Sequence, residues 1–184
     1  MNPQTTDDPD GSDPEIETVT VEVSNTQLYL AIDPDRVARL VRDVLEGEAI
    51  TDACLSIAVV DDATIRALNR RFLDHDWPTD VITFPLSGPD EPTLSGELIV
   101  SAEMAAVTAR ESAAAPWDEL SLYLVHGLLH LCGYDDRLDD DRDAMRQREG
   151  EILARLGLTN TFSAVAASIA VTDGGVRESA RWTV

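Results

Sequence analysis

The sequence predicts an α/β (α+β) fold in which a small, mixed, four-stranded sheet packs against about five helices. Two observations predict it. Short runs of apolar and β-branched residues alternate with longer segments in which apolar residues recur at helical spacing. These elements follow the order strand, helix, strand, helix, strand, strand, helix, helix, helix, and no internal repeat is present.

The first strand and helix are predicted between residues 18 and 47. Valines alternate with polar residues over 18–23, which indicates a strand. Asp33 and Pro34 predict a helix start, because aspartate caps the first turn and proline is accepted in it. The helix is expected to end near Gly47. Its predicted apolar face contains Val37, Leu40, Val41, Val44 and Leu45.

A second strand and helix follow, and then two more strands. The apolar run at 53–60 predicts a buried strand, and either Asp61 or Asp62 is expected to cap the next helix. The predicted buried stripe of that helix contains Ile65, Leu68 and Phe72. Residues 80–84 and 96–101 are the expected third and fourth strands.

Three helices complete the predicted domain. Ser101 can cap a helix that runs to about residue 112. Residues 117–131 form a strongly apolar helix, which Gly133 is expected to end. Residues 138–156 form a charged, amphipathic last helix.

Charge separates a tail from an acidic body. Residues 1–17 hold six acidic residues and no basic residue, which predicts a disordered acidic tail. Residues 18–158 are the expected functional domain, and 159–184 an irregular C-terminal extension. The net charge is −21 and all 14 basic residues are arginine. Such a charge repels nucleic acid and anionic membranes at long range, so RNA binding would depend on local arginines.

The expected compartment is the cytoplasm. The first residues lack the basic and apolar regions of a signal peptide, and no apolar run is long enough to cross a bilayer. Cys54 and Cys132 lie in apolar runs and do not form a CxxC pair. We therefore expect two reduced, buried thiols.

His126 and His130 form a metal-binding pattern. Their spacing is slightly more than one helical turn, so both side chains project from one face and can bind one ion. Gly133 can take the left-handed conformation that ends a helix and folds the chain back. Asp136 can then supply a third ligand while a fourth position stays open, as in catalytic sites. The predicted metal site therefore lies at the end of a central helix.

This spacing is similar to the metzincin protease motif HExxHxxGxxH, but two positions differ. Gly127 stands where those proteases have the glutamate that acts as general base, and Asp136 stands where they have a third histidine. Peptide hydrolysis loses its proton acceptor without that glutamate. The pattern therefore argues against a protease.

HGLLHLCGYDD at 126–136 resembles the signature HGxLHLxGYDH of the YbeY family of endoribonucleases and ribosomal RNA maturation factors. LNRRFLDHDWPTDVITFP at 68–85 resembles that family's LNxxYRxKDxPTDVLSFP, and GELIV at 96–100 its GDIVI strand. The resemblance covers about residues 20–157. It implies a metal-dependent endoribonuclease that acts on single-stranded ribosomal RNA, at the 3′ end of the small-subunit RNA, during ribosome maturation.

By this resemblance, the zinc ligands of the family fall on His126, His130 and Asp136, and one zinc ion is the expected cofactor. The third position is a change from histidine to aspartate. Aspartate is a competent zinc ligand. Its harder oxygen donor is expected to widen the tolerance for another divalent metal such as manganese or iron.

Three residues are candidate catalytic groups. The family's arginine in the YR pair, which is suited to holding a phosphate beside the metal, falls on Leu73. Arg70 and Arg71 precede it and are candidates for the missing cation, with a solvated helix face as the alternative. His75 could transfer a proton or contact a phosphate, and a plain surface histidine is its alternative. Asp80, in the family's TD pair, could orient a ligand histidine or cap the following strand.

Two alternatives to RNA cleavage stay open. The chain could be a non-catalytic, metal-containing ribosome-assembly factor that binds ribosomal RNA, ribosomal particles and basic ribosomal proteins. It could also be an unrelated zinc hydrolase with a small substrate. No membrane partner is expected in any of these cases.

Overall fold

The computed structural model describes residues 18–161, and the expected tail at 1–17 and residues 162–184 of the expected extension lie outside the described residues. The strands are β1 (Thr18–Asn25), β2 (Asp52–Val60), β3 (Val81–Pro85) and β4 (Leu94–Ser101). The helices are α1 (Pro34–Gly47), α2 (Asp62–Leu73), α3 (Ala102–Glu111), α4 (Pro116–Leu131) and α5 (Asp139–Arg155). The predicted α/β class and element order are confirmed.

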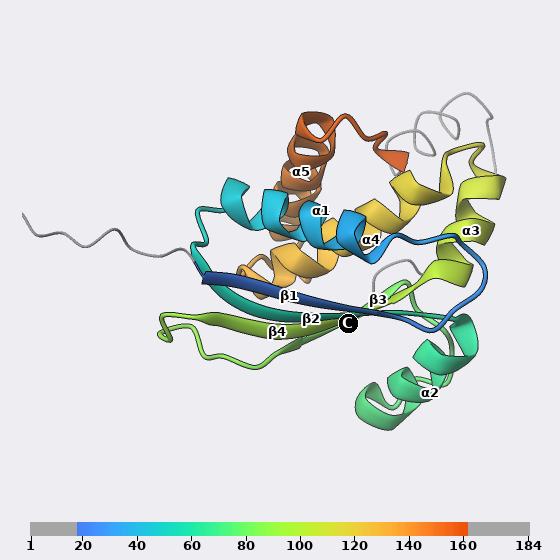
Figure 1. The fold of residues 1–184 in the computed structure, drawn as a ribbon, viewed down its shortest axis with the longest axis horizontal. Coiled ribbons are helices and arrows are strands. Elements are labelled where there is room, and N and C mark those ends of the chain that lie inside the picture. The colour runs from blue at the N-terminus through green and yellow to red at the C-terminus, as the bar shows by residue number, and fades with distance from the viewer. Residues whose placement is uncertain (1–17, 162–184) are drawn as a thin grey trace, which may run out of the picture.

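The four strands form one mixed sheet in the order β1-β2-β4-β3. β1, β2 and β4 run parallel, whereas β3 pairs antiparallel with β4. β3 therefore lies at one edge of the sheet. α1, α4 and α5 lie on one side of this sheet, and α2 lies on the other side (Figure 1).

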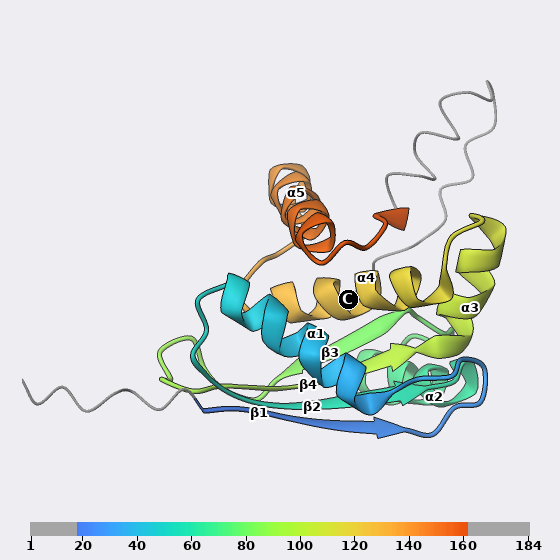
Figure 2. The ribbon, with the colours of Figure 1, turned by 45° about the horizontal axis from the view of Figure 1, so that its top comes forward.

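α4 is the central helix of the fold. It packs on β3, β4, α1 and α3, and α5 packs on it from outside, so that α4 lies between the sheet and α5 (Figure 2). Twelve of its 16 residues are buried. A helix enclosed on several sides must be apolar almost all round, which explains its composition.

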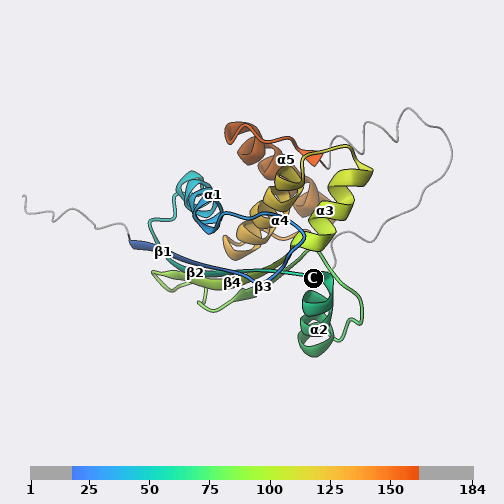
Figure 3. The same ribbon diagram turned by 45° about the vertical axis from the view of Figure 1, so that its right-hand side comes forward.

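β2 is buried on one face only. Ala53, Leu55 and Ile57 point to the helices and are buried, but Cys54 points to the open face and is exposed. The prediction of a buried Cys54 was therefore wrong. Alternate side chains of a strand face opposite sides, and α2 covers only one end of the second side (Figure 3). Cys132 is partly buried.

α2 covers a small second core. Val60, Ile65, Ile82 and Ile99 form this cluster, and the partly buried Leu68, Leu73 and Phe84 pack against it. Phe72 was predicted to join the buried stripe but is 52% exposed. It lies on the last turn of α2, where its ring meets the Phe84 ring of the edge strand at a centroid distance of 5.3 Å.

Three predicted helix caps are confirmed. The Asp33 side chain accepts a hydrogen bond from the Asp35 amide, and the Ser101 hydroxyl accepts one from the Met104 amide. Asp61, and not Asp62, caps α2, by accepting from the Thr64 amide at 2.8 Å. No helix within residues 18–161 is long and apolar enough to span a membrane.

Candidate metal centre

The end of α4 turns the chain back toward its own histidines. Gly133 has a φ of +95°, a left-handed conformation that a side chain would strain. The Tyr134 amide donates to the Leu129 carbonyl and the Gly133 amide donates to the His130 carbonyl, each at 3.0 Å. These two bonds form a Schellman motif. The predicted role of Gly133 is confirmed, and the motif carries Asp136 back to the helix.

His126, His130 and Asp136 come together as predicted. One ligand atom from each residue lies within 4.8 Å of the others, so this group could hold a metal ion. The two histidine Nε2 atoms are 3.0 Å apart, and His126 Nε2 is 4.0 Å from Asp136 Oδ2. His126 is buried, and its two companions are partly buried.

The opposite ring nitrogens of both histidines have oxygen partners. His126 Nδ1 donates to Glu149 Oε1 at 2.7 Å, and His130 Nδ1 donates to the Tyr134 carbonyl at 3.0 Å. A proton on each Nδ1 leaves both Nε2 lone pairs facing one point. Two such lone pairs repel each other unless a cation lies between them, so this donor set fits a transition-metal ion.

Burial sets the protonation of this group. It lowers the pKa of His126 to about 4, with His130 adding to the effect and the negative charge of Asp80 opposing it. Burial also raises the pKa of Glu149 to about 7. His126 is therefore neutral at physiological pH, which is the state that binds a metal.

Glu149 of α5 is the site residue that the sequence analysis missed. Its side chain is 4% exposed and holds His126 from outside the ligand group. The missed signal is its helical spacing, since Glu149 shares one face of α5 with the buried Met145 and Ile152. A glutamate in an apolar stripe must have a buried partner.

Asp80 makes local contacts. Its Oδ1 accepts from the Val81 amide at 2.8 Å and from the Thr79 hydroxyl at 2.9 Å. Burial raises its pKa, while the charge of His126 acts in the opposite direction. Asp80 therefore lies near the metal group and directly precedes β3, whereas the partner of His126 Nδ1 is Glu149.

Arg70 and Arg71 are exposed on α2, across the sheet from α4 (Figure 3). His75 is partly buried and its ring stacks on Trp77 at a centroid distance of 4.6 Å. Leu73, at the position of the family's arginine, packs into the apolar cluster beneath α2. The catalytic roles of Arg70, Arg71 and His75 stay predictions.

Gly127 lets α4 approach the sheet closely. A Cβ atom there would lie 2.8 Å from Leu98 Cδ2, 3.0 Å from Val81 Cγ2 and 3.1 Å from Thr83 Oγ1. Such contacts leave no room for a side chain. The residue after His126 therefore faces the sheet, where a glutamate like that of the metzincins has no place.

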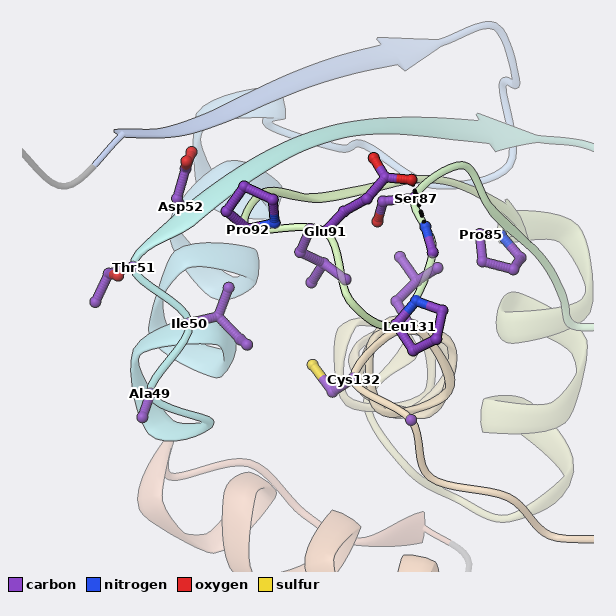
Figure 4. A pocket seen from close by; sticks show the side chains of 14 residues that line it. Ala49, Ile50, Thr51, Asp52, Pro85, Ser87, Glu91, Pro92, Leu131 and Cys132 are labelled. Carbon is purple, nitrogen blue, oxygen red and sulfur yellow. Dashed lines mark hydrogen bonds between the residues drawn. The ribbon is translucent and has the colours of Figure 1, made fainter.

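A larger pocket lies beside the C-terminal end of α4, and its lining contains none of the three candidate metal ligands. Its volume is about 570 Å³, and Figure 4 shows Leu131 and Cys132 on one wall with Glu91 and Pro92 across from them. Asp52 also lines it, and none of the described lining residues is basic. Two carboxylates without a cation make it a poor receptor for a polyanion.

The comparisons with known proteins identify a family. The family model described as Endoribonuclease YbeY matches residues 22–157. The protein named Endoribonuclease YbeY from Pelotomaculum thermopropionicum is 38% identical over 149 residues, which cover 76% of this chain and 98% of that protein. Its namesake from Syntrophotalea carbinolica is 36% identical over 142 residues, which cover 74% of this chain and 95% of that protein.

One solved structure supports the fold. The solution structure of TM1509 from Thermotoga maritima is similar with a TM-score of 0.51 and 23% identity, and the match covers 86% of this chain and 100% of that one. The family match spans the second half of β1 and all the other strands and helices described above, together with His126, His130 and Asp136. This chain belongs to the YbeY endoribonuclease family.

Proposed function

We propose that this protein is a metal-dependent endoribonuclease that cuts single-stranded ribosomal RNA during ribosome maturation, at the 3′ end of the small-subunit RNA. The observation that carries the proposal is the convergence of His126, His130 and Asp136 at the end of α4 in a chain of this family. Three ligands with a fourth position free are the arrangement of catalytic metal sites.

One zinc ion is the proposed cofactor, because two imidazoles and one carboxylate are a common zinc donor set. When bound, the ion would act as a Lewis acid toward a phosphate oxygen. The chain itself prepares the site. Glu149 and the Tyr134 carbonyl fix the two rings with Nε2 inward, and the turn at Gly133 delivers the Asp136 carboxylate.

The exposed ring of Trp77 supports single-stranded RNA as the substrate. Trp77 is 52% exposed and stacks on His75. Trp77 lies three residues before Asp80, and Asp80 interacts electrostatically with His126 of the metal group. Unpaired bases offer flat faces that stack on such rings, whereas a duplex hides them. The substrate we propose therefore places an unpaired base near Trp77 and a phosphate at the metal.

A non-catalytic assembly factor is the second candidate, and the net charge of −21 favours it. An acidic surface attracts basic ribosomal proteins and repels RNA at long range. In that case the metal would organise a binding cleft on ribosomal particles without turnover.

RNA cleavage by the full-length protein distinguishes the two. We expect the zinc-loaded protein to cut single-stranded ribosomal RNA, a chelator to abolish cleavage, and added zinc to restore it. Asp136→Ala should lose both ion and cleavage. The matched control Asp135→Asn, an exposed neighbour, should keep both. Cleavage that persists in chelator, or binding to ribosomal particles without any cleavage, would contradict the enzymatic proposal.

A further inference from the structure

The face of α5 that packs on α4 changes from apolar to charged near the metal group. Toward the C-terminus it is apolar, with Ile152 and Leu153 buried. One to three turns earlier the same face presents Arg142, Arg146 and Glu149, which follow the i, i+4, i+7 spacing of one helix side.

These two arginines line a small pocket beside the metal ligands. Its lining contains His126 and Asp136 from the metal group, and Arg142, Met145, Arg146 and Glu149 from α5. Both arginines are partly buried, unlike the exposed Arg70 and Arg71 of α2. The free volume is about 10 Å³, which is room for about one oxygen atom.

The charges near the metal group favour a phosphate-binding role for these two arginines. Asp136, Glu149 and Asp80 place three carboxyl groups in or beside the candidate metal group. A phosphodiester is negatively charged, so carboxyl groups alone would not favour its binding there, whereas neighbouring cations would. Arg142 and Arg146 are the two arginines that line the adjoining pocket. Arg142 forms an ion pair with the exposed Asp139, and Arg146 attracts Glu149.

We propose that Arg146, assisted by Arg142, binds a non-bridging oxygen of the RNA phosphodiester in the pocket between α4 and α5. The inference rests on the proposed function and names the phosphate-binding residues of that site. A guanidinium donates two parallel hydrogen bonds to phosphate oxygens, which also aligns the group beside the metal position. The cation absent at Leu73 on one side of the sheet is thus supplied by α5 on the other.

Binding of inorganic phosphate tests the proposal without catalysis. Calorimetric titration of zinc-loaded protein compares the wild type with Arg146→Gln, Arg142→Gln and their double variant. We expect Arg146→Gln to weaken phosphate binding about 10-fold or more, since it removes a charge-assisted contact. Arg146→Lys should recover part of the loss, because it restores charge without the planar fork.

Two further measurements complete the experiment. Zinc content and the unfolding temperature should stay near wild-type values in Arg146→Gln, which separates phosphate binding from metal loss and misfolding. The control Arg137→Gln should bind phosphate normally, because Arg137 is 79% exposed and lies outside the pocket lining.

The outcomes are distinguishable from failure of the proposed function. If the protein binds phosphate through Arg146 but cuts no RNA, the enzymatic proposal fails and this inference stands. If the double variant binds phosphate like the wild type, or the wild type binds none, the inference is overturned. It is equally overturned if substitution of Arg70 and Arg71 weakens phosphate binding and substitution of Arg146 does not.

Discussion

Removal of the Glu149 carboxylate should weaken metal binding without touching a ligand. Glu149 Oε1 accepts a hydrogen bond from His126 Nδ1 at 2.7 Å, in a position that is almost closed to solvent. In Glu149→Ala this buried N–H loses its acceptor, which costs about 1–3 kcal/mol. Loss of a partner that orients a metal-binding histidine lowers metal affinity by about 10- to 100-fold, a similar free energy.

Glu149→Gln separates geometry from charge. Its amide oxygen can still accept from His126 Nδ1, so we expect a loss of about 10-fold, at the lower end of the range. The matched control is Glu151→Ala on the same helix, because the Glu151 side chain is 48% exposed and accepts hydrogen bonds from Gln147 and Arg148. The Glu151→Ala variant should bind metal like the wild type.

Competition with a coloured zinc chelator measures these affinities directly. The expected order of zinc dissociation constants is wild type, then Glu149→Gln, then Glu149→Ala, with Glu151→Ala equal to wild type. A dissociation constant for Glu149→Ala within about 2-fold of wild type would refute the reasoning, because the His126 ring would then be held without Glu149.

Three further outcomes are expected. Gly127→Ala should lower the unfolding free energy by about 1–3 kcal/mol in denaturant titration, because its Cβ would overpack Leu98; an unchanged midpoint would contradict this. Asp61→Ala should cost about 1 kcal/mol at neutral pH. Hydrogen bonds from Thr64 lower the pKa of Asp61 below 3.8, so the deficit should persist above that pH and shrink as the pH falls through the folded pKa; a deficit constant down to pH 2 would oppose the assignment. Trp77→Ala should raise KM for single-stranded RNA by about 10-fold at unchanged zinc content; equal KM values would exclude base stacking there.

Local chemistry explains why much of the fold was predictable. Asp33, Asp61 and Ser101 cap helices through amides two or three residues away, and such contacts depend on neighbouring residues alone. The spacing of His126 and His130 and the conformation of Gly133 are equally local. The metal group was therefore accessible without knowledge of the tertiary structure.

The exposure of individual side chains could not be predicted from neighbouring residues in the same way. Cys54 lies in an apolar run and Phe72 continues the helical spacing of Ile65 and Leu68, yet both are exposed. Whether a strand face or the end of a helix is covered depends on which other element packs there. Here α2 covers only part of the second face of the sheet (Figure 1), and Phe72 on its last turn meets Phe84 of the edge strand β3.

The helices and strands, the candidate metal-binding triad at the end of α4 and the YbeY resemblance could be predicted from the sequence, because each depends on residues close together in the chain. What surrounds the triad depends on the tertiary structure. Glu149 is 23 residues from His126, and packing of α5 on α4 brings it and the two arginines to the site. Long-range packing is a property of whole surfaces, and no short pattern encodes it.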